Sequence, residues 1–443
     1  MKQWHRVALI LCIFGFLKDF RPSEPFMIEF VTGPEHNLTV DQVVQDVLPI
    51  GTYSYVPQLV VAFLITDYFR YKPMIIVSGL AGTVVWSLFV WSRSLRALQV
   101  LQVFYATFLA TEIGFNSYIY TRVDRKHYQK ITSYINTATL AGRFLASTSS
   151  QMLIYFGITD YLGLNYISLG AQLSITVWSF LLPPVPASIY FHQEQPPEEQ
   201  IELKSDKRQS TPESTCHRAT TLLWSHFKSA YTNFTVIRYS LWNAVAMCLI
   251  LQIIVYVQAL WSTIGGADTV FWNGAVEAGL TLMSSLASLL AGFVPQKYLK
   301  LHITLPGLSV IAIVEGLALF LATVTSNLTV SYICYILVGI LNAFSGTLVA
   351  SEIAKHICDD SFALIFGINS TVALILQSLF TLAVVDSNGW FALDIRGQYT
   401  VCSYLYIAIG VVFTIFLIDE LCRRRKPKQV NGSVDEQQLN LSL

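Results

Sequence analysis

The sequence predicts an all-α membrane protein built from two six-helix halves, and three observations carry this prediction. Hydrophobic residues make up 53% of the 443-residue chain and charged residues only 13%, where an average soluble domain carries about 25% charge. Apolar segments of about 20 residues, the length that spans a bilayer, recur along the chain. One long polar segment divides these apolar segments into two sets of six.

The apolar segments set the predicted order of twelve transmembrane helices. They lie at about 5–20, 49–66, 73–91, 97–120, 130–156 and 163–182, and then at 236–261, 271–294, 303–323, 331–355, 362–385 and 398–420. The polar segment between the sets opens with three prolines in four residues and has the composition of a disordered linker. We therefore predict an N-terminal six-helix bundle (1–182), a largely disordered cytosolic linker (183–235), a C-terminal six-helix bundle (236–421) and a cytosolic tail (422–443).

Lysine and arginine in the short loops predict the orientation, because cytosolic loops are enriched in both. Counting from a cytosolic N-terminus, loops that follow even-numbered helices hold residues such as Arg122, Arg125 and Lys297, whereas the other loops hold few. Both termini and the linker are therefore predicted to be cytosolic. The sequons at Asn37 and Asn327 then fall outside, where they are predicted glycosylation sites.

Six plus six helices around a cytosolic linker is the plan of the major facilitator fold. In that fold two halves rock about a site near the membrane midplane. The short turn after the second predicted helix carries Asp67 and Arg70, at the place where such folds keep a charged gating turn. We interpret these two residues as gating charges.

Composition excludes several other classes of function. The net charge is zero, which argues against a nucleic-acid partner. The seven cysteines form no C-x-x-C pair and are interpreted as small buried apolar residues rather than as metal ligands. Because no nucleophile elbow or paired acid–base motif is present, we expect neither an enzyme nor a cofactor.

The stretch Arg21-Pro22-Ser23-Glu24-Pro25-Phe26 follows the first apolar segment. Charges beside such apolar sequence are costly unless they line a cavity, and the two prolines interrupt helical hydrogen bonding. We interpret this hexapeptide as the wet, charged mouth of a pathway. A loop that caps the first helix is the alternative.

Ionisable residues inside the predicted spans are candidates for function, since each is costly in a bilayer unless it is paired or hydrated. Glu112 shares a helix face with Phe108 and Phe115, and a carboxylate beside aromatic rings can hold an organic cation. The alternative for Glu112 is a structural ion pair with Arg143.

Three further carboxyl groups lie within or at the ends of the predicted spans. Glu277 begins the eighth helix, where a gate contact and a substrate contact are both open interpretations. Glu315 and Glu352 are interpreted either as proton relays or as hydrogen-bonded core carboxyls.

Several motifs in order along the chain are similar to those of the family of reduced folate carriers and thiamine transporters. They include the hexapeptide above, Thr52-Tyr53-Ser54-Tyr55, Leu164-Asn165-Tyr166-Ile167-Ser168-Leu169 and Asn273-Gly274-Ala275-Val276-Glu277-Ala278. The resemblance covers about residues 8–420 without the linker. It implies a twelve-helix facilitator that carries a B vitamin across the plasma membrane.

Within that resemblance the charges favour the thiamine transporters. Folate carriers place an arginine at the position of Glu112 and a lysine at that of Gln377, whereas thiamine transporters carry glutamate and glutamine there. The chain departs from thiamine members at Gly51, where they have tryptophan, and at Asn136, where the family has arginine. We suggest that Arg143, two turns along from Asn136, replaces this arginine and pairs with Glu112 in one gating state.

We therefore expect a multi-pass plasma-membrane carrier of thiamine or a related organic cation. Glu112 and Glu24 would supply negative charge, Phe115 a ring face, and Tyr118 and Gln377 polar contacts. We predict a gating or structural role for five further charges: Arg21, Arg143, Asp67, Arg70 and Glu277. The alternatives are a carrier of reduced folate and, from another class, a receptor that binds a vitamin without moving it.

Overall fold

The computed structural model describes residues 3–68, 71–118, 128–183, 224–225, 227–266, 269–294, 301–357 and 362–425. Its regular elements are all helices within these ranges, which confirms the all-α class. Seven of the described helices are long and apolar enough to cross a membrane. The number of twelve spans stays a prediction.

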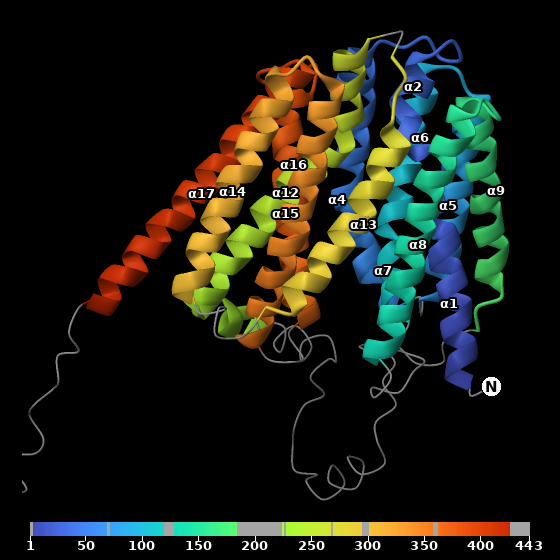
Figure 1. The fold of residues 1–443 in the computed structure, drawn as a ribbon. Coiled ribbons are helices and arrows are strands. Elements are labelled where there is room, and N and C mark those ends of the chain that lie inside the picture. The colour runs from blue at the N-terminus through green and yellow to red at the C-terminus, as the bar shows by residue number, and fades with distance from the viewer. Residues whose placement is uncertain are drawn as a thin grey trace, which may run out of the picture.

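The long helices fall into two groups, which Figure 1 shows at the right (blue to green) and at the left (lime to red). The first group is α1 (Gln3–Asp19), α4 (Leu48–Tyr68), α5 (Lys72–Trp91), α6 (Leu95–Ala110), α7 (Glu112–Tyr118), α8 (Tyr128–Tyr155) and α9 (Tyr161–Phe180). The second group is α12 (Phe234–Gly265), α13 (Asn273–Gly292), α14 (Leu301–Val324), α15 (Leu328–Lys355), α16 (Phe362–Phe380) and α17 (Ile395–Arg425). Most boundaries agree with the predicted segments within about three residues.

The two ends of the bundle differ in what they hold. We call the end that contains α2 (Met27–Thr32) the upper end, as it is drawn in Figure 1. At the opposite, lower end α1 begins, α9 ends, α12 begins and α17 ends. The described start of α1 and the described end of α17 thus lie at the same end, and the cytosolic position of the termini and the linker stays a prediction.

The second predicted helix begins earlier than hydropathy indicates. Two short elements, α3 (Val40–Gln42) and the π-helical turn η2 (Val43–Val47), precede α4 without a break. They begin at a capping box: the Gln42 backbone N–H donates to the Thr39 hydroxyl over 3.2 Å, and the Thr39 N–H donates to the Gln42 side chain over 3.1 Å. Thr-x-x-Gln at residues 39–42 is the sequence signal for this start.

The fourth predicted helix is broken where the sequence predicts one continuous segment over 97–120. It ends as α6 at Ala110 and resumes as α7 at Glu112. Between them, the Thr111 hydroxyl donates to the Thr107 carbonyl over 2.8 Å and to the Phe108 carbonyl over 3.1 Å. Such back-bonding bends helices, and here it occurs immediately before a candidate site residue.

Candidate substrate site and the contact between the helix groups

Six charged side chains cluster around the end of α1. Three ion pairs hold them together: Lys18 Nζ lies 2.9 Å from Glu112, Arg143 lies 2.9 Å from Asp19, and Arg21 lies 2.8 Å from Glu24. Asp19 also lies 3.5 Å from Arg21, which connects two of the pairs. The three positive and three negative charges balance, which low-dielectric surroundings demand.

Burial divides the six charges into two kinds. The side chains contributed by the end of α1 and the following turn are buried: Lys18 is 4% exposed, Asp19 5% and Arg21 6%. Their partners are accessible, with Glu112 41% exposed, Glu24 39% and Arg143 50%. The cluster therefore presents two carboxylates and one guanidinium on its accessible side.

Arg21 is the buried centre of the upper part of this cluster. The Tyr105 hydroxyl donates to Glu24 Oε1 over 2.8 Å and accepts from Arg21 over 3.4 Å. The guanidinium also lies 5.9 Å from the Trp86 ring centre and 5.6 Å from that of Phe108, distances at which a cation and an aromatic face attract each other. These contacts fix the position of the Glu24 carboxylate.

The predicted charged mouth at residues 21–26 is wrong except at Glu24. Arg21, Ser23, Pro25 and Phe26 are buried. The Ser23 hydroxyl lies 2.9 Å from that of Ser168 and accepts from the indole N–H of Trp86 over 2.9 Å. Pro25 lies in a 3₁₀ turn, Glu24–Phe26, that packs into the protein. The hexapeptide therefore contributes to the core and exposes one carboxylate.

The predicted partnership of Glu112 with Arg143 is not made in this structure, because Lys18 and Asp19 take the two partners. Sequence reasoning missed both residues by assigning them to the end of an apolar segment. The available signal was the adjacent pair of opposite charges, Lys18 and Asp19, at the end of α1 and within three residues of Arg21.

Other predicted binding residues lie in the core. Phe115 is 3% exposed and packs against Phe14 with ring centres 5.0 Å apart. Tyr118 is fully buried, and its hydroxyl donates to the Pro183 carbonyl over 2.6 Å. Gln377, on α16, is 4% exposed. The structure does not bring these three side chains to the accessible side of Glu112.

A different ring approaches Glu112. Tyr55 of α4 is partly buried and lies close enough to Glu112 to feel its charge. At Gly51, one turn earlier on α4, a Cβ would meet only the end of the flexible Gln102 side chain, at 2.6 Å. Position 51 supplies no ring in this chain, and Tyr55 is the aromatic candidate on α4.

Of the remaining predicted charges, Glu277 accepts a hydrogen bond from the Tyr335 hydroxyl over 2.8 Å. It lies within electrostatic reach of Arg143 and Glu24 of the first helix group. The side chain of Asp67 and the whole of Arg70 lie outside the described residues. Glu352 pairs with Lys355 over 2.6 Å.

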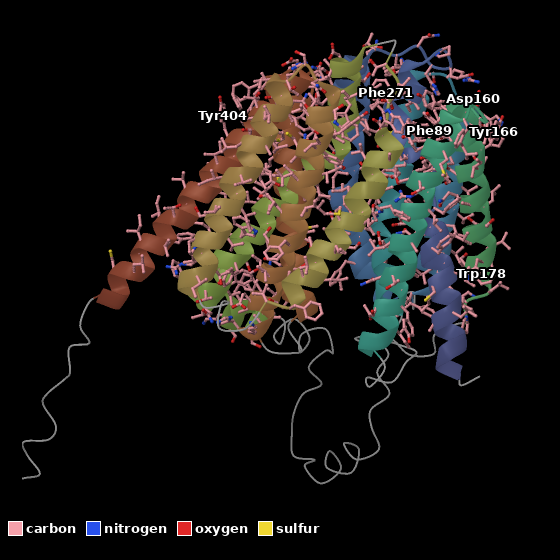
Figure 2. The ribbon with its side chains drawn as sticks, viewed as in Figure 1. Phe89, Asp160, Tyr166, Trp178, Phe271 and Tyr404 are labelled. Carbon is pink, nitrogen blue, oxygen red and sulfur yellow. The ribbon has the colours of Figure 1, made fainter. Side chains whose placement is uncertain are left out.

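At the upper end, polar contacts join the two helix groups. Gln258 of α12 donates to the Glu24 carbonyl over 2.9 Å and accepts from the Ile28 N–H over 3.3 Å. Asn273, the first residue of α13, donates to Glu29 over 3.1 Å. Gln151 of α8 donates over 3.3 Å to the carbonyl of Phe271, which Figure 2 labels at this end.

A second set of contacts joins α4 and its preceding turn to the end of α16. There the Tyr53 hydroxyl donates to Asp386 over 2.8 Å, and the Ser387 hydroxyl donates to Asp46 over 2.8 Å. Asp46 lies within the π-helical turn η2, and Asp386 and Ser387 directly follow a second one, η7 (Thr381–Val385). We call the two sets together the upper contacts; they close this end of the molecule across the divide between the groups.

Comparison with known proteins identifies relatives over nearly the whole chain. The family model described as "Reduced folate carrier" matches residues 2–401. Folate transporter 1 of Caenorhabditis elegans is 33% identical and covers 95% of this chain and 93% of its own length. Human thiamine transporter 1 is 31% identical, with coverage of 97% and 94%.

Solved structures show the same fold at low sequence identity. A point mutant of the nucleoside transporter NupG superimposes with a TM-score of 0.65 at 12% identity, over 92% of this chain and 99% of its own. The POT family transporter PepTSo gives a TM-score of 0.64 at 13% identity, over 94% of this chain and 98% of its own. These neighbours confirm the major facilitator fold. Because relatives and neighbours alike are transporters, the expectation that the chain is not an enzyme is also confirmed.

Proposed function

Because the chain belongs to the reduced folate carrier family, we propose that this multi-pass membrane protein is a vitamin transporter whose substrate is thiamine or a related organic cation. Its relatives include proteins named for folate and for thiamine, so family membership alone does not select the charge of the substrate. The main support for a cationic substrate is that two carboxylates, Glu112 and Glu24, are accessible in the charged cluster. Carboxylates beside aromatic rings suit a cation.

The transport cycle follows from the two helix groups. In the proposed mechanism the bundles rock about the charged cluster, and the upper contacts open and close access from one side. Glu112 and Glu24 bind the cation, and the Tyr55 ring packs against it. Glu277, in the second group, interacts electrostatically with the charges of the site. Residues 1–182 and 236–421 act as the two bodies, joined by the linker 183–235, and no cofactor takes part.

We place the protein in the plasma membrane with both termini and the tail 422–443 in the cytosol. Asn37 and Asn327 support this orientation, because both are exposed. Asn37 lies between α2 and α3, and Asn327 lies between α14 and α15; α2 is at the upper end, opposite the start of α1 and the end of α17 (Figure 1). Glycosylation of these asparagines in cells, tested by glycosidase digestion of the protein and of Asn37→Gln and Asn327→Gln variants, would fix the outer side.

A reduced folate is the second candidate substrate, and one observation favours it. Arg143 is half exposed and has Asp19 as its partner, so an anion could take the place of that carboxylate. Two accessible carboxylates against one guanidinium favour the cation. Removing the Glu112 carboxylate should reduce transport of a cation and increase transport of an anionic folate.

The deciding experiment is uptake of labelled thiamine and of labelled folate, side by side, in cells that express the chain. We expect thiamine uptake that falls at least tenfold in Glu112→Gln. The matched control is Glu35→Gln, because Glu35 pairs with Arg93 in an exposed loop and its loss should leave uptake unchanged.

Other outcomes would redirect the assignment. Folate uptake without thiamine uptake would overturn the cation site and make Arg143 the anion partner. Binding of either vitamin to protein at the cell surface without uptake would favour a receptor that does not transport.

A further inference from the structure

We propose that Lys18 competes with the cationic substrate for Glu112. It pairs with Glu112 in the empty protein, and so sets both the affinity for the cation and the rate at which the empty carrier returns to load again. This inference rests on the proposed function, in which Glu112 binds the substrate cation. It concerns a residue to which neither the motifs nor the predicted site assigned a role.

Lys18 approaches Glu112 from the buried side. Its ammonium lies 2.9 Å from the carboxylate, and the side chain is 4% exposed. The ring of Phe108, centred 5.2 Å from the ammonium, flanks it. The backbone is held as well, since Gln172 of α9 donates to the Lys18 carbonyl over 3.4 Å. The lysine is thus presented to Glu112 by packed helices rather than by a flexible surface.

Glu112 itself is open on its other side, with 41% of its side chain exposed. A cation that arrives at this open side meets a carboxylate that is already neutralised. Binding therefore has to weaken or displace the Lys18–Glu112 pair, and the free energy of the pair is subtracted from that of binding. In this way Lys18 sets the affinity for a cation without touching it.

The same pair has a consequence for the empty protein. A carrier that returns unloaded has to move its binding site through a closed, low-dielectric arrangement, in which an uncompensated carboxylate is costly. Lys18 removes that cost, because it neutralises Glu112 whenever the substrate is absent. A loaded carrier does not need the lysine, since the substrate supplies the positive charge.

If Lys18 neutralises Glu112 only in the empty carrier, its loss should slow net uptake but not exchange, a pattern that a merely structural lysine would not produce. We compare Lys18→Met, which keeps an unbranched side chain and removes the charge, with Lys18→Arg, which restores it. The purified full-length protein is placed in vesicles with labelled thiamine as the probe. Two rates are measured: net uptake into empty vesicles and exchange into vesicles preloaded with thiamine.

For Lys18→Met we expect KM for thiamine to fall roughly three- to tenfold, because competition is removed. Net uptake at saturation should fall at least fivefold, while exchange stays within twofold of the unmodified protein. Lys18→Arg should restore both values. Lys72→Met, which removes a lysine bonded to the Phe180 carbonyl at the lower end, should change neither.

The outcomes separate the two proposals. If the unmodified protein transports thiamine but Lys18→Met leaves KM and the ratio of net uptake to exchange unchanged, the role of Lys18 is overturned and the cation site stands. Equal loss of net uptake and exchange, with a folded protein by thermal melting, also overturns it. If the unmodified protein neither binds nor moves thiamine, the cation site fails, and the role of Lys18 fails with it.

Discussion

Arg21 shows how a single buried charge organises this protein. It lies between Asp19 and Glu24, receives support from Tyr105, and is flanked by two aromatic rings. A buried ion network of this kind contributes little net stability relative to an apolar core, but loss of one member leaves the others without compensation. The network around Arg21 instead fixes the position of the accessible Glu24 carboxylate.

Replacing Arg21 tests this interpretation. Arg21→Met should destabilise the protein by about 3–5 kcal/mol, because it removes the buried partner of Glu24 and one of the two guanidinium groups that compensate buried Asp19. Arg93→Met removes a comparable ion pair, with Glu35, that is exposed and should cost less than about 1 kcal/mol. Thermal melting of the detergent-solubilised proteins measures both. Similar melting temperatures for the two variants would show that the Arg21 network is not buried in the folded protein.

At the scale of elements, a glycine sets how closely the two helix groups approach. A Cβ at Gly274, in the first turn of α13, would lie 2.7 Å from the Ser147 carbonyl and 2.8 Å from the Ser150 hydroxyl of α8. At Gly279, further along the same helix, the nearest atom would be 3.9 Å away. Only the first glycine is required for the contact between α8 and α13.

Two alanine substitutions form a matched pair on this helix. Gly274→Ala should push α13 away from α8 and cost about 1–3 kcal/mol of stability through overpacking. Gly279→Ala has the same propensity effect without the clash and should be neutral or slightly stabilising. Melting temperatures report the difference, and equal effects would refute the close-approach explanation.

The order of elements could be predicted because the length and hydropathy of a segment decide whether it spans a bilayer. The charged site could only be predicted in part. Glu112 and Glu24 stood out as carboxylates near apolar sequence, but their partners depend on how α1, α7 and α8 are rotated against one another. Phe115 shares a face with Glu112 by helical spacing, yet that face turns toward Phe14 in the core.

At the scale of the whole molecule, the upper contacts join the two helix groups, and in the proposed transport cycle they hold one of its two states. Polar contacts between the groups lie at one end in the described residues, through Gln258, Asn273 and Gln151 on one flank and through Tyr53 and Ser387 on the other. Polar contacts of this kind break at a moderate cost in free energy, because water replaces the lost hydrogen bonds. They suit a closure that has to open in every cycle.

A cross-link tests whether this closure is part of transport. In a chain whose seven cysteines are replaced by alanine, Asp46→Cys with Ser387→Cys should form a disulfide under oxidation, since the native side chains meet at 2.8 Å. Oxidation should reduce uptake at least tenfold, and a reductant should restore it. Each single cysteine variant serves as the control. Full uptake by the cross-linked protein would show that this end does not open.

The pairing of the α1 charges also affects how the protein is made. Lys18 and Asp19 leave the ribosome before their partners Glu112 and Arg143, which follow about 90 to 120 residues later. At about 5–20 residues per second, that interval is on the order of ten seconds. Until then each unpaired charge costs up to about 3 kcal/mol at depth in the bilayer. We therefore expect the first helix to reach its final position only after the fourth and fifth predicted helices have been made.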